Sequence, residues 1–286
     1  MMSVRRNGEG GVVLVNVLVI IALAATVVYL MLSRQDLSLD RIARMAEATE
    51  AQQLALGAEA SVVDALWRDL ETVSEADHFQ EPWASVIQDE VQLPTGRFSV
   101  RVEDVQARYD INLLGSAGLG PVETVARLLE ALDQPPDLAR RMAAMVRRIG
   151  PIEDLSRLAA VGVPDSVIAA LDPYVTALPV PGTVNLNTAP PLLLEAMLRN
   201  RSIALRLVSA RNRTGSLTRE DITGAGGLRP ENSGFTSGVF DVFVTAEAGG
   251  ALVMLGSRIL RVDGIDGRSI RILRRRIVTG NEGEDD

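Results

Sequence analysis

The chain has 286 residues, of which 47% are hydrophobic, so it holds enough apolar side chains to fold into domains of ordinary size. Its net charge of −8 disfavours general nucleic-acid binding, because affinity for phosphates comes mainly from clustered cations. The absence of lysine and cysteine excludes Schiff-base chemistry, Walker-type phosphate loops, thiolate metal sites and disulfides, and the single histidine, His78, excludes metal sites with several imidazoles.

The N-terminal region predicts a retained membrane helix. A polar leader, residues 1–11, contains Arg5 and Arg6, and the 21 residues Val12–Leu32 carry no charge. About 20 apolar residues in a helix span the hydrocarbon core of a bilayer, and no small-residue cleavage site follows Leu32. The two arginines favour a cytoplasmic N-terminus with the body outside, so we expect a single-pass membrane protein with its C-terminal body on the external side.

The helical pattern continues beyond the membrane. Residues 33–70 contain no proline, and Gly57 is their only glycine. Apolar residues recur there at helical spacing and charges fill the other positions, which predicts one helix of roughly 55 residues, half in lipid and half against a soluble domain. A membrane anchor followed by a separate helix is the alternative.

The junction between leader and helix resembles a type IV prepilin signal. The resemblance implies cleavage after Gly11, with Gly10 as the neighbouring alternative, and N-methylation of Val12. Most pilins carry glutamate at the fifth mature position, where this chain has Asn16. In pilins that carboxylate is thought to pair with the terminal amine of a neighbouring subunit, so Asn16 fits a subunit at the filament tip. It fits equally well a polar residue tolerated on one helix face.

The body is predicted to contain strands on both sides of a helical segment. Phe98, Val100 and Val102 alternate with polar residues, as in a half-buried strand. The glycine-rich loop 114–120 lacks the strand–helix context of a dinucleotide site, so we interpret it as a crossing between subdomains. Short helices are then predicted at 121–132, 136–149, 151–160, 164–171, 192–198 and 203–213, with a helix-hairpin-helix pattern around Gly162.

Three β-branched runs close the chain. Val239–Thr245, Leu252–Val262 and Ser269–Val278 are separated by Gly-Gly and Asp-Gly turns, which indicates an antiparallel meander. Together with the strand near residue 100 they predict a four-stranded sheet. Residues 280–286 form an acidic tail.

The predicted fold is therefore α+β: a pilin-like long N-terminal helix packed on a four-stranded antiparallel sheet, with an all-α helix-hairpin-helix or SAM-like insert. The expected divisions are the leader 1–11, the transmembrane part 12–32, the helix and first strand 33–112, the insert 113–232, the closing strands 233–279 and the tail 280–286.

Several segments together resemble the minor pseudopilins of the general secretion pathway protein K family of the type II secretion system. These are the Gly11–Val12 junction without glutamate, the strand Phe98–Asp104 leading to Asn112, the segment 151–175, the sequence VNLNTAP at 184–190 and the closing meander. The resemblance implies a non-enzymatic subunit that caps the pseudopilus with two other minor pseudopilins and is needed for export across the outer membrane. It also implies contact with the major pseudopilin and with prepilin peptidase.

The resemblance does not identify calcium ligands in this chain. Family members can bind calcium in the insert, but this chain has no EF-hand spacing and lacks the Asp-rich, aromatic-rich stretch expected early in the insert. Calcium is thus implied by resemblance alone, with its ligands unknown, and no other cofactor is expected.

Residues 185–213 also resemble a second kind of protein. The NLNTA sequence followed by two helices is similar to the hairpin modules of competence-type DNA receptors, but the turn at 199–202 lacks the glycines that hold a phosphate there. Nucleic acid is not an expected partner, because the arginines of this segment fit a solvated helix face: Arg199, Arg201, Arg206, Arg211 and Arg213. A membrane-anchored DNA-binding receptor and a minor pilin of a type IV pilus are the alternative functions.

The remaining polar candidates are interpreted as structural. Asn185, Asn187 and Thr188 are expected to cap the helix that starts near Pro190 and to satisfy backbone groups between subdomains. His78 is expected in an exposed loop. We identify no catalytic residues and expect no enzymatic activity.

Overall fold

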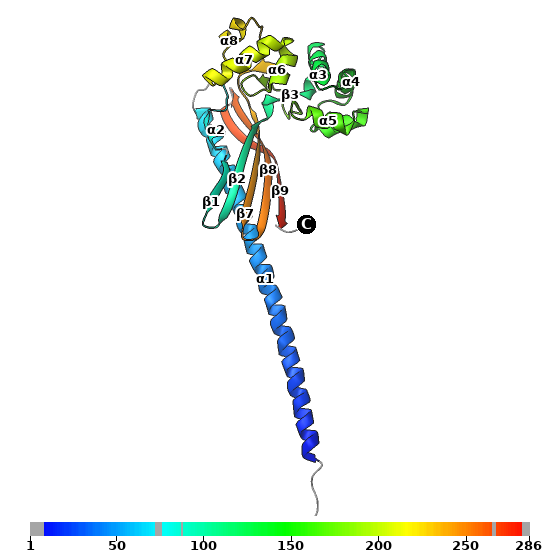
Figure 1. The fold of residues 1–286 in the computed structure, drawn as a ribbon, viewed down its shortest axis with the longest axis vertical. Helices are drawn as coiled ribbons and strands as arrows, with labels where there is room; N and C mark the ends of the chain where they lie inside the picture. Colours follow the sequence, from blue (N-terminus) through cyan, green and yellow to red (C-terminus); the bar gives the residue numbers. More distant parts are fainter. Residues whose placement is uncertain (1–8, 72–75, 87, 265–266, 282–286) are drawn as a thin grey trace, which may run out of the picture.

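A single helix dominates the molecule. The computed structural model describes residues 9–71, 76–86, 88–264 and 267–281. Helix α1 (Glu9–Glu71) runs for 63 residues without interruption, so the alternative of an anchor plus a separate helix is wrong. Only its second half lies against the body, and the first half projects alone (Figure 1). The leader residues 1–8 and the tail residues 282–286 lie outside the described part.

The body is built on an antiparallel sheet of five strands. Its order is β1-β2-β7-β8-β9, and the strands are β1 (Gln88–Leu93), β2 (Gly96–Asp104), β7 (Val239–Ala248), β8 (Ala251–Gly264) and β9 (Gly267–Asn281). Four of them were predicted, but the edge strand β1 was not. Its sequence QDEVQL contains only two apolar residues and shows no clear alternation, so pairing with β2 rather than its own pattern defines it.

The sheet packs one face against α1. Small and branched side chains lie on the contacting stripe of the helix, at Ala51, Ala55, Ala58, Val62 and Leu66. They meet the inward-facing residues of the central strands, among them Val100, Val242, Val244 and Val253. The spacing of three and four residues on the helix and of two on the strands is what places both sets in one core.

The insert forms a second core at the end of the sheet that lies farthest from the free half of α1 (Figure 1). Its helices are α3 (Gly120–Ala131), α4 (Leu138–Ile149), α5 (Asp165–Leu171), α6 (Pro191–Leu198), α7 (Arg201–Thr214) and α8 (Arg219–Gly224). The predicted helix at 151–160 is instead the 3₁₀ segment η3 (Leu155–Val161), and α8 was not predicted. Short 3₁₀ segments η1 (Val105–Ala107) and η2 (Ile111–Gly115) follow β2, and α2 (Pro82–Ser85) follows α1.

The insert is not all-α. Two parallel pairs of two-residue strands tie it to the rest of the chain: β3 (Tyr109–Asp110) pairs with β4 (Val175–Thr176), and β5 (Val184–Asn185) pairs with β6 (Ser233–Gly234). Such short parallel pairs leave no periodic pattern in the sequence, because partners far apart in the chain create them. They hold both ends of the insert next to the sheet.

Candidate functional site

The projecting half of α1 exposes a continuous apolar surface. Every described residue from Leu14 to Leu32 is exposed, and α1 is the one helix of the described residues that is long and apolar enough to cross a membrane. Gly11 and Val12 lie in the first turns of this helix, and Asn16 is exposed one turn further on. The helix fits a single-pass membrane anchor, as the sequence predicted.

The apolar surface continues past the expected membrane boundary. Leu37, Leu39, Ile42 and Met45 are each about 60–70% exposed, although they lie between the uncharged stretch and the body. Large exposed apolar side chains on a segment outside the lipid indicate a protein interaction surface. This segment of α1 is therefore a candidate assembly surface.

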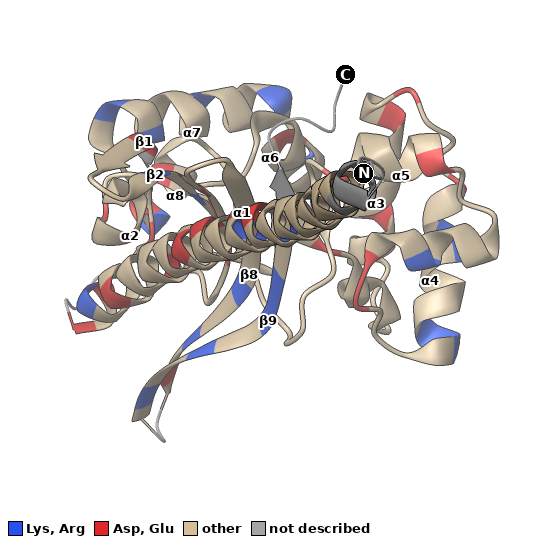
Figure 2. Cartoon of the chain, turned by 90° about the horizontal axis from the view of Figure 1, so that it is seen from below, with Lys and Arg blue, Asp and Glu red and all other residues tan. Residues whose placement is uncertain are grey.

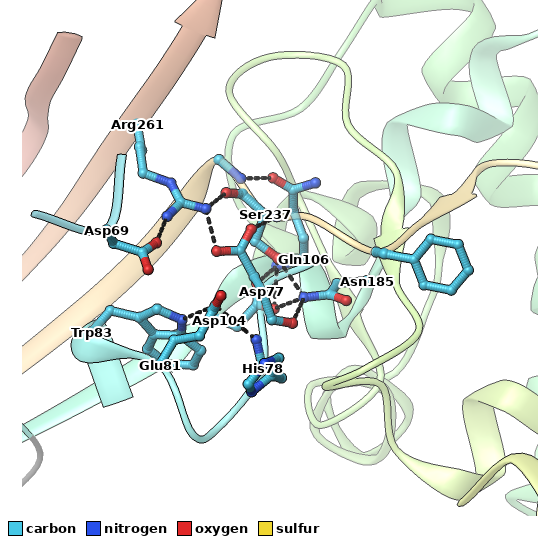
Figure 3. A network of polar contacts seen from close by, with 12 residues as sticks. Asp69, Asp77, His78, Glu81, Trp83, Asp104, Gln106, Asn185, Ser237 and Arg261 are labelled. Atoms are coloured by element: carbon cyan, nitrogen blue, oxygen red, sulfur yellow. Dashed lines mark hydrogen bonds and ion pairs between the residues drawn. The ribbon is translucent and has the colours of Figure 1, made fainter. Parts of the chain in front are cut away.

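A buried polar network lies where the sheet meets the insert (Figure 3). At its centre is Asp104, the last residue of β2 and the N-cap of η1. Its carboxylate accepts hydrogen bonds from Gln106 N (2.8 Å), Asn185 Nδ2 (3.0 Å), Ser237 Oγ (2.7 Å) and Thr188 Oγ1. Burial raises the pKa of Asp104 above its ordinary value, and these donors oppose that shift.

The predicted polar residues of the insert converge on this network. The Nδ2 group of Asn185 also donates to the Asp77 carbonyl (3.0 Å), while its Oδ1 accepts from Asn187 N (3.0 Å). Asn187 in turn accepts from Leu217 N (2.7 Å) and donates to the Phe235 carbonyl (3.3 Å). Apart from the local bond between Asn185 and Asn187, these contacts connect segments distant in sequence, which is the bridging role expected between subdomains.

The expected capping role of these residues is wrong. Helix α6 begins at Pro191 after the N-cap Pro190, and no side chain caps it. A proline at N1 has no amide hydrogen, so this helix has one N–H group fewer that needs an acceptor. The side chains of Asn185, Asn187 and Thr188 instead form hydrogen bonds at the boundary between the sheet and the insert, which we call the junction.

A second group of buried charges adjoins the network. The Arg261 guanidinium on β8 pairs with both Asp69, near the end of α1, and Asp77, and it donates to the Ser237 carbonyl (2.6 Å). It also lies over the Phe240 ring, 5.1 Å from the centroid. Burial raises the pKa of Asp69 to about 6 despite Arg261, and the neighbouring Glu81 and Asp77 carboxylates act in the same direction. One arginine thus links the helix, the following loop and the sheet.

The same acidic residues are the candidate metal ligands of the described chain. Carboxylate oxygens of Asp69, Asp77 and Glu81 lie within 4.8 Å of one another, and all three residues are buried. Two of them already face Arg261, and Glu81 accepts from the Trp83 indole (3.2 Å). All three carboxylates therefore have donors within the chain, and we assign the cluster no ion.

His78 belongs to the loop that carries this cluster. It is half-buried rather than exposed. Its backbone N donates to Glu81 Oε2 (3.0 Å), and its Nδ1 accepts from Gln80 N (3.2 Å). Neither contact places a nucleophile beside the ring. The histidine shapes the loop that brings Asp77 and Glu81 into the junction.

The arginines of the helical hairpin are engaged within the chain. Arg199 pairs with Glu123 and Arg201 approaches Glu195 at 4.0 Å. Arg206 donates to the Ala225 carbonyl, and Arg211 donates to the carbonyls of Leu186 and Ala189. Four of the five candidate phosphate contacts therefore have partners inside the insert, which weakens the DNA-receptor alternative.

The junction gives a testable pH dependence through Asp110. Burial raises the pKa of Asp110 to about 6, although its Oδ1 accepts from Asn112 N (3.0 Å) and Leu178 N (3.2 Å). The folded chain holds this proton more tightly than the unfolded chain, so the free energy of unfolding should fall as pH rises from about 4 to 6. Asp110→Asn keeps the acceptor oxygen and should remove roughly 2–3 kcal/mol of that pH-dependent change.

The measurement is denaturant unfolding of the purified full chain in detergent at several pH values. Asp137→Asn, at an exposed helix start, is the matched control and should leave the pH dependence as it is in the parent chain. If the free energy of unfolding changed with pH in the same way for the parent chain and for Asp110→Asn, the raised pKa of Asp110 would be contradicted.

Comparisons with known proteins agree with these features. The family model described as type II secretion system (T2SS), protein K matches residues 184–242, which include Asn185, Asn187, Thr188 and Ser237 of the junction. The type II secretion system protein K of Pseudomonas aeruginosa is 28% identical, over 76% of this chain and 77% of that protein. This chain is a relative of type II secretion system protein K.

The fold agrees as well. A chain of the crystal structure of the GspK-GspI-GspJ complex from the type 2 secretion system of enterotoxigenic Escherichia coli matches with a TM-score of 0.62 and 20% identity. The match covers 84% of this chain and 99% of that chain. The two chains thus share an overall fold over most of their length.

Proposed function

We propose that the chain is a minor pseudopilin of a type II secretion system, anchored in the inner membrane with its body in the periplasm. The observation that carries the proposal is α1 itself: its first half is exposed and apolar, and its second half is fixed to a pilin-like sheet. Such a helix can leave the bilayer and pack against the helices of other subunits without exposing a charge from Val12 to Leu32. The protein K match favours type II secretion over a type IV pilus.

The insert supports a position at the tip of the pseudopilus. It covers the end of the body opposite the free half of α1 (Figure 1), where a subunit stacked further along the fibre would have to fit. We therefore propose that the chain caps the fibre together with two other minor pseudopilins, on top of the major pseudopilin, and thereby serves protein export across the outer membrane. The proposed role is assembly, with no catalysed reaction.

Cleavage by prepilin peptidase tests the proposal. In cells with an active peptidase, mass spectrometry should find a mature chain that begins with N-methylated Val12. Gly11→Trp should abolish this processing, because a large side chain then occupies the residue before the cleaved bond. A parent chain that still begins at Met1, or that begins beyond Leu32, would overturn the proposal. Gly10→Trp is the matched variant, and selective loss of processing there would move the cut by one residue.

Asn16 gives a second test of the tip position. Asn16→Glu places a carboxylate in the membrane, where it is costly unless it finds a cationic partner. We expect the variant to insert and be processed, but to be recovered with the minor pseudopilins less often than the parent chain. Co-purification after cross-linking measures this, with Thr26→Ser on the same helix as a control. Unchanged recovery would remove Asn16 as an argument for the tip.

A further inference from the structure

The edge strand β9 is unlike the rest of this acidic chain. Its described residues, Gly267–Asn281, include five arginines and no acidic residue. It pairs with β8 on one side and is the last strand of the sheet, so its other side offers unpaired backbone groups. Figure 2 shows basic residues along the β8–β9 hairpin. An open edge with one sign of charge is a candidate docking surface that extends beyond the proposed function.

A bulge aligns three of these arginines on one face. Arg258 pairs with Arg274 and Ile259 pairs with Ile272, so Leu273 has no partner on β8. Directly opposed residues of an antiparallel pair share a face, and Arg276 opposes Gly256, which opposes the exposed Phe243. Arg271, Arg274 and Arg276 therefore all lie on the sheet face away from α1, although the first two are three positions apart in the sequence.

The charges on this face are only partly compensated. Arg268 pairs with Asp263 at 3.2 Å, and Arg275 points to the other face, where it pairs with Glu59 of α1. Arg274 lies near Asp154 of the insert. Within the described chain Arg271 and Arg276 have no ion-pair partner, and both are exposed. Two guanidinium groups along the edge are thus available to an anionic partner.

Apolar side chains accompany these charges. Phe243, Met254 and Val278 lie on the same face and are 39%, 47% and 40% exposed. Met254 is directly opposite Val278, and Phe243 lies in the neighbouring row with Arg276. Arg101 lies over the Phe243 ring, 4.8 Å from its centroid. Aromatic residues, methionine and arginine are the types enriched at protein interfaces, whereas a solvated sheet face is normally polar.

The geometry argues against a lipid surface as the occupant. The turn at the lower end of the sheet touches α1 at Glu47, through Gly250 N and Glu47 Oε2 at 3.2 Å. From Leu32 to Glu47 the helix rises about 22 Å at 1.5 Å per residue. That distance exceeds the Debye length of about 8–10 Å at physiological salt, so lipid headgroups are too far away to attract these arginines.

We propose that β9 binds an extended acidic segment of another protein, which adds to the sheet as a sixth strand. Backbone hydrogen bonds to the open edge supply general affinity, and side chains at alternate positions supply specificity. The residues of the added strand that face Arg271, Arg274 and Arg276 are acidic, because the bulge spaces these three arginines evenly, opposite Leu260, Arg258 and Gly256 of β8, at about 6.6 Å per step. The partner is thus a segment with a carboxylate at every second residue.

The test uses the full chain in nanodiscs of zwitterionic lipid and a capped eight-residue peptide of alternating glutamate and threonine. Titration gives the affinity, and hydrogen exchange reports which amides become protected. We expect protection of β9 by this peptide and none by the matching peptide of lysine and threonine. Arg271→Glu with Arg276→Glu should weaken binding roughly tenfold or more and should instead allow the lysine peptide to bind.

The matched control makes the same change of charge elsewhere. Arg140→Glu with Arg148→Glu lies on the exposed face of α4, and neither arginine has an ion-pair partner in the described chain. This variant should bind the acidic peptide as the parent chain does.

Equal weakening by both double variants, equal binding of both peptides, or no protection of β9 would overturn the proposal. The last result would mean that the charged, bulged edge only prevents strand addition. Stronger protection of β9 by duplex DNA or by anionic vesicles would overturn it in favour of those ligands.

Discussion

Replacing Arg261 with leucine should lower the free energy of unfolding at pH 7 by about 3–5 kcal/mol, because it leaves Asp69 and Asp77 buried without their cation. The arginine side chain is 8% exposed and both carboxylates are 3% exposed, so the two carboxylates would have little access to solvent without their partner. The loss should shrink below about pH 6, because burial raises the pKa of Asp69 to about 6 and its carboxyl group can take up a proton there. Arg261→Lys should also destabilise, since a single ammonium does not reproduce the forked contact with two carboxylates.

The control is an exposed pair of the same chemistry. Arg141 and Asp137 lie 3.3 Å apart on α4 with side chains that are both 57% exposed, and Arg141→Leu should change the free energy of unfolding by less than about 1 kcal/mol. Denaturant unfolding of the full chain in detergent at pH 7 and pH 5 measures both variants. A loss at Arg261 as small as that at Arg141 would show that the buried cluster contributes little to stability.

The regular elements were predictable because each carries its own periodic pattern. The uncharged run 12–32 and the helical spacing after it predicted α1, and the three β-branched runs between glycine-containing turns predicted β7, β8 and β9. Strand β1 and the pairs β3–β4 and β5–β6 escaped prediction, because tertiary partners define them and their short sequences carry no pattern. The expected sheet therefore had one strand too few, and the insert was expected to be purely helical.

The junction was predictable only on the insert side. Asn185, Asn187 and Thr188 stood out as a cluster of short polar residues, whereas their partners Asp104 and Ser237 were not singled out. A signal did exist for the charged pair. Asp69 lies three residues after the core residue Leu66, and Arg261 lies two residues after the buried strand residue Ile259, so both occupy core-facing positions. Charges at such positions must be paired, but the sequence does not say with what.

Removing the Asp104 carboxylate should separate the body from the insert. The two have distinct hydrophobic cores, and Asp104 joins them by accepting from Asn185 and Thr188 of the insert side and from Ser237 at the start of the closing strands. Asp104→Ala leaves these buried donors without an acceptor, at a cost of about 3 kcal/mol or more. Because each core keeps its own packing, we expect calorimetry to resolve two thermal transitions where the parent chain shows one.

Asp241→Ala removes a carboxylate of the outer sheet face and should lower stability without splitting the transition. A single transition for Asp104→Ala would mean that the strand pairs β3–β4 and β5–β6 suffice to couple the two cores.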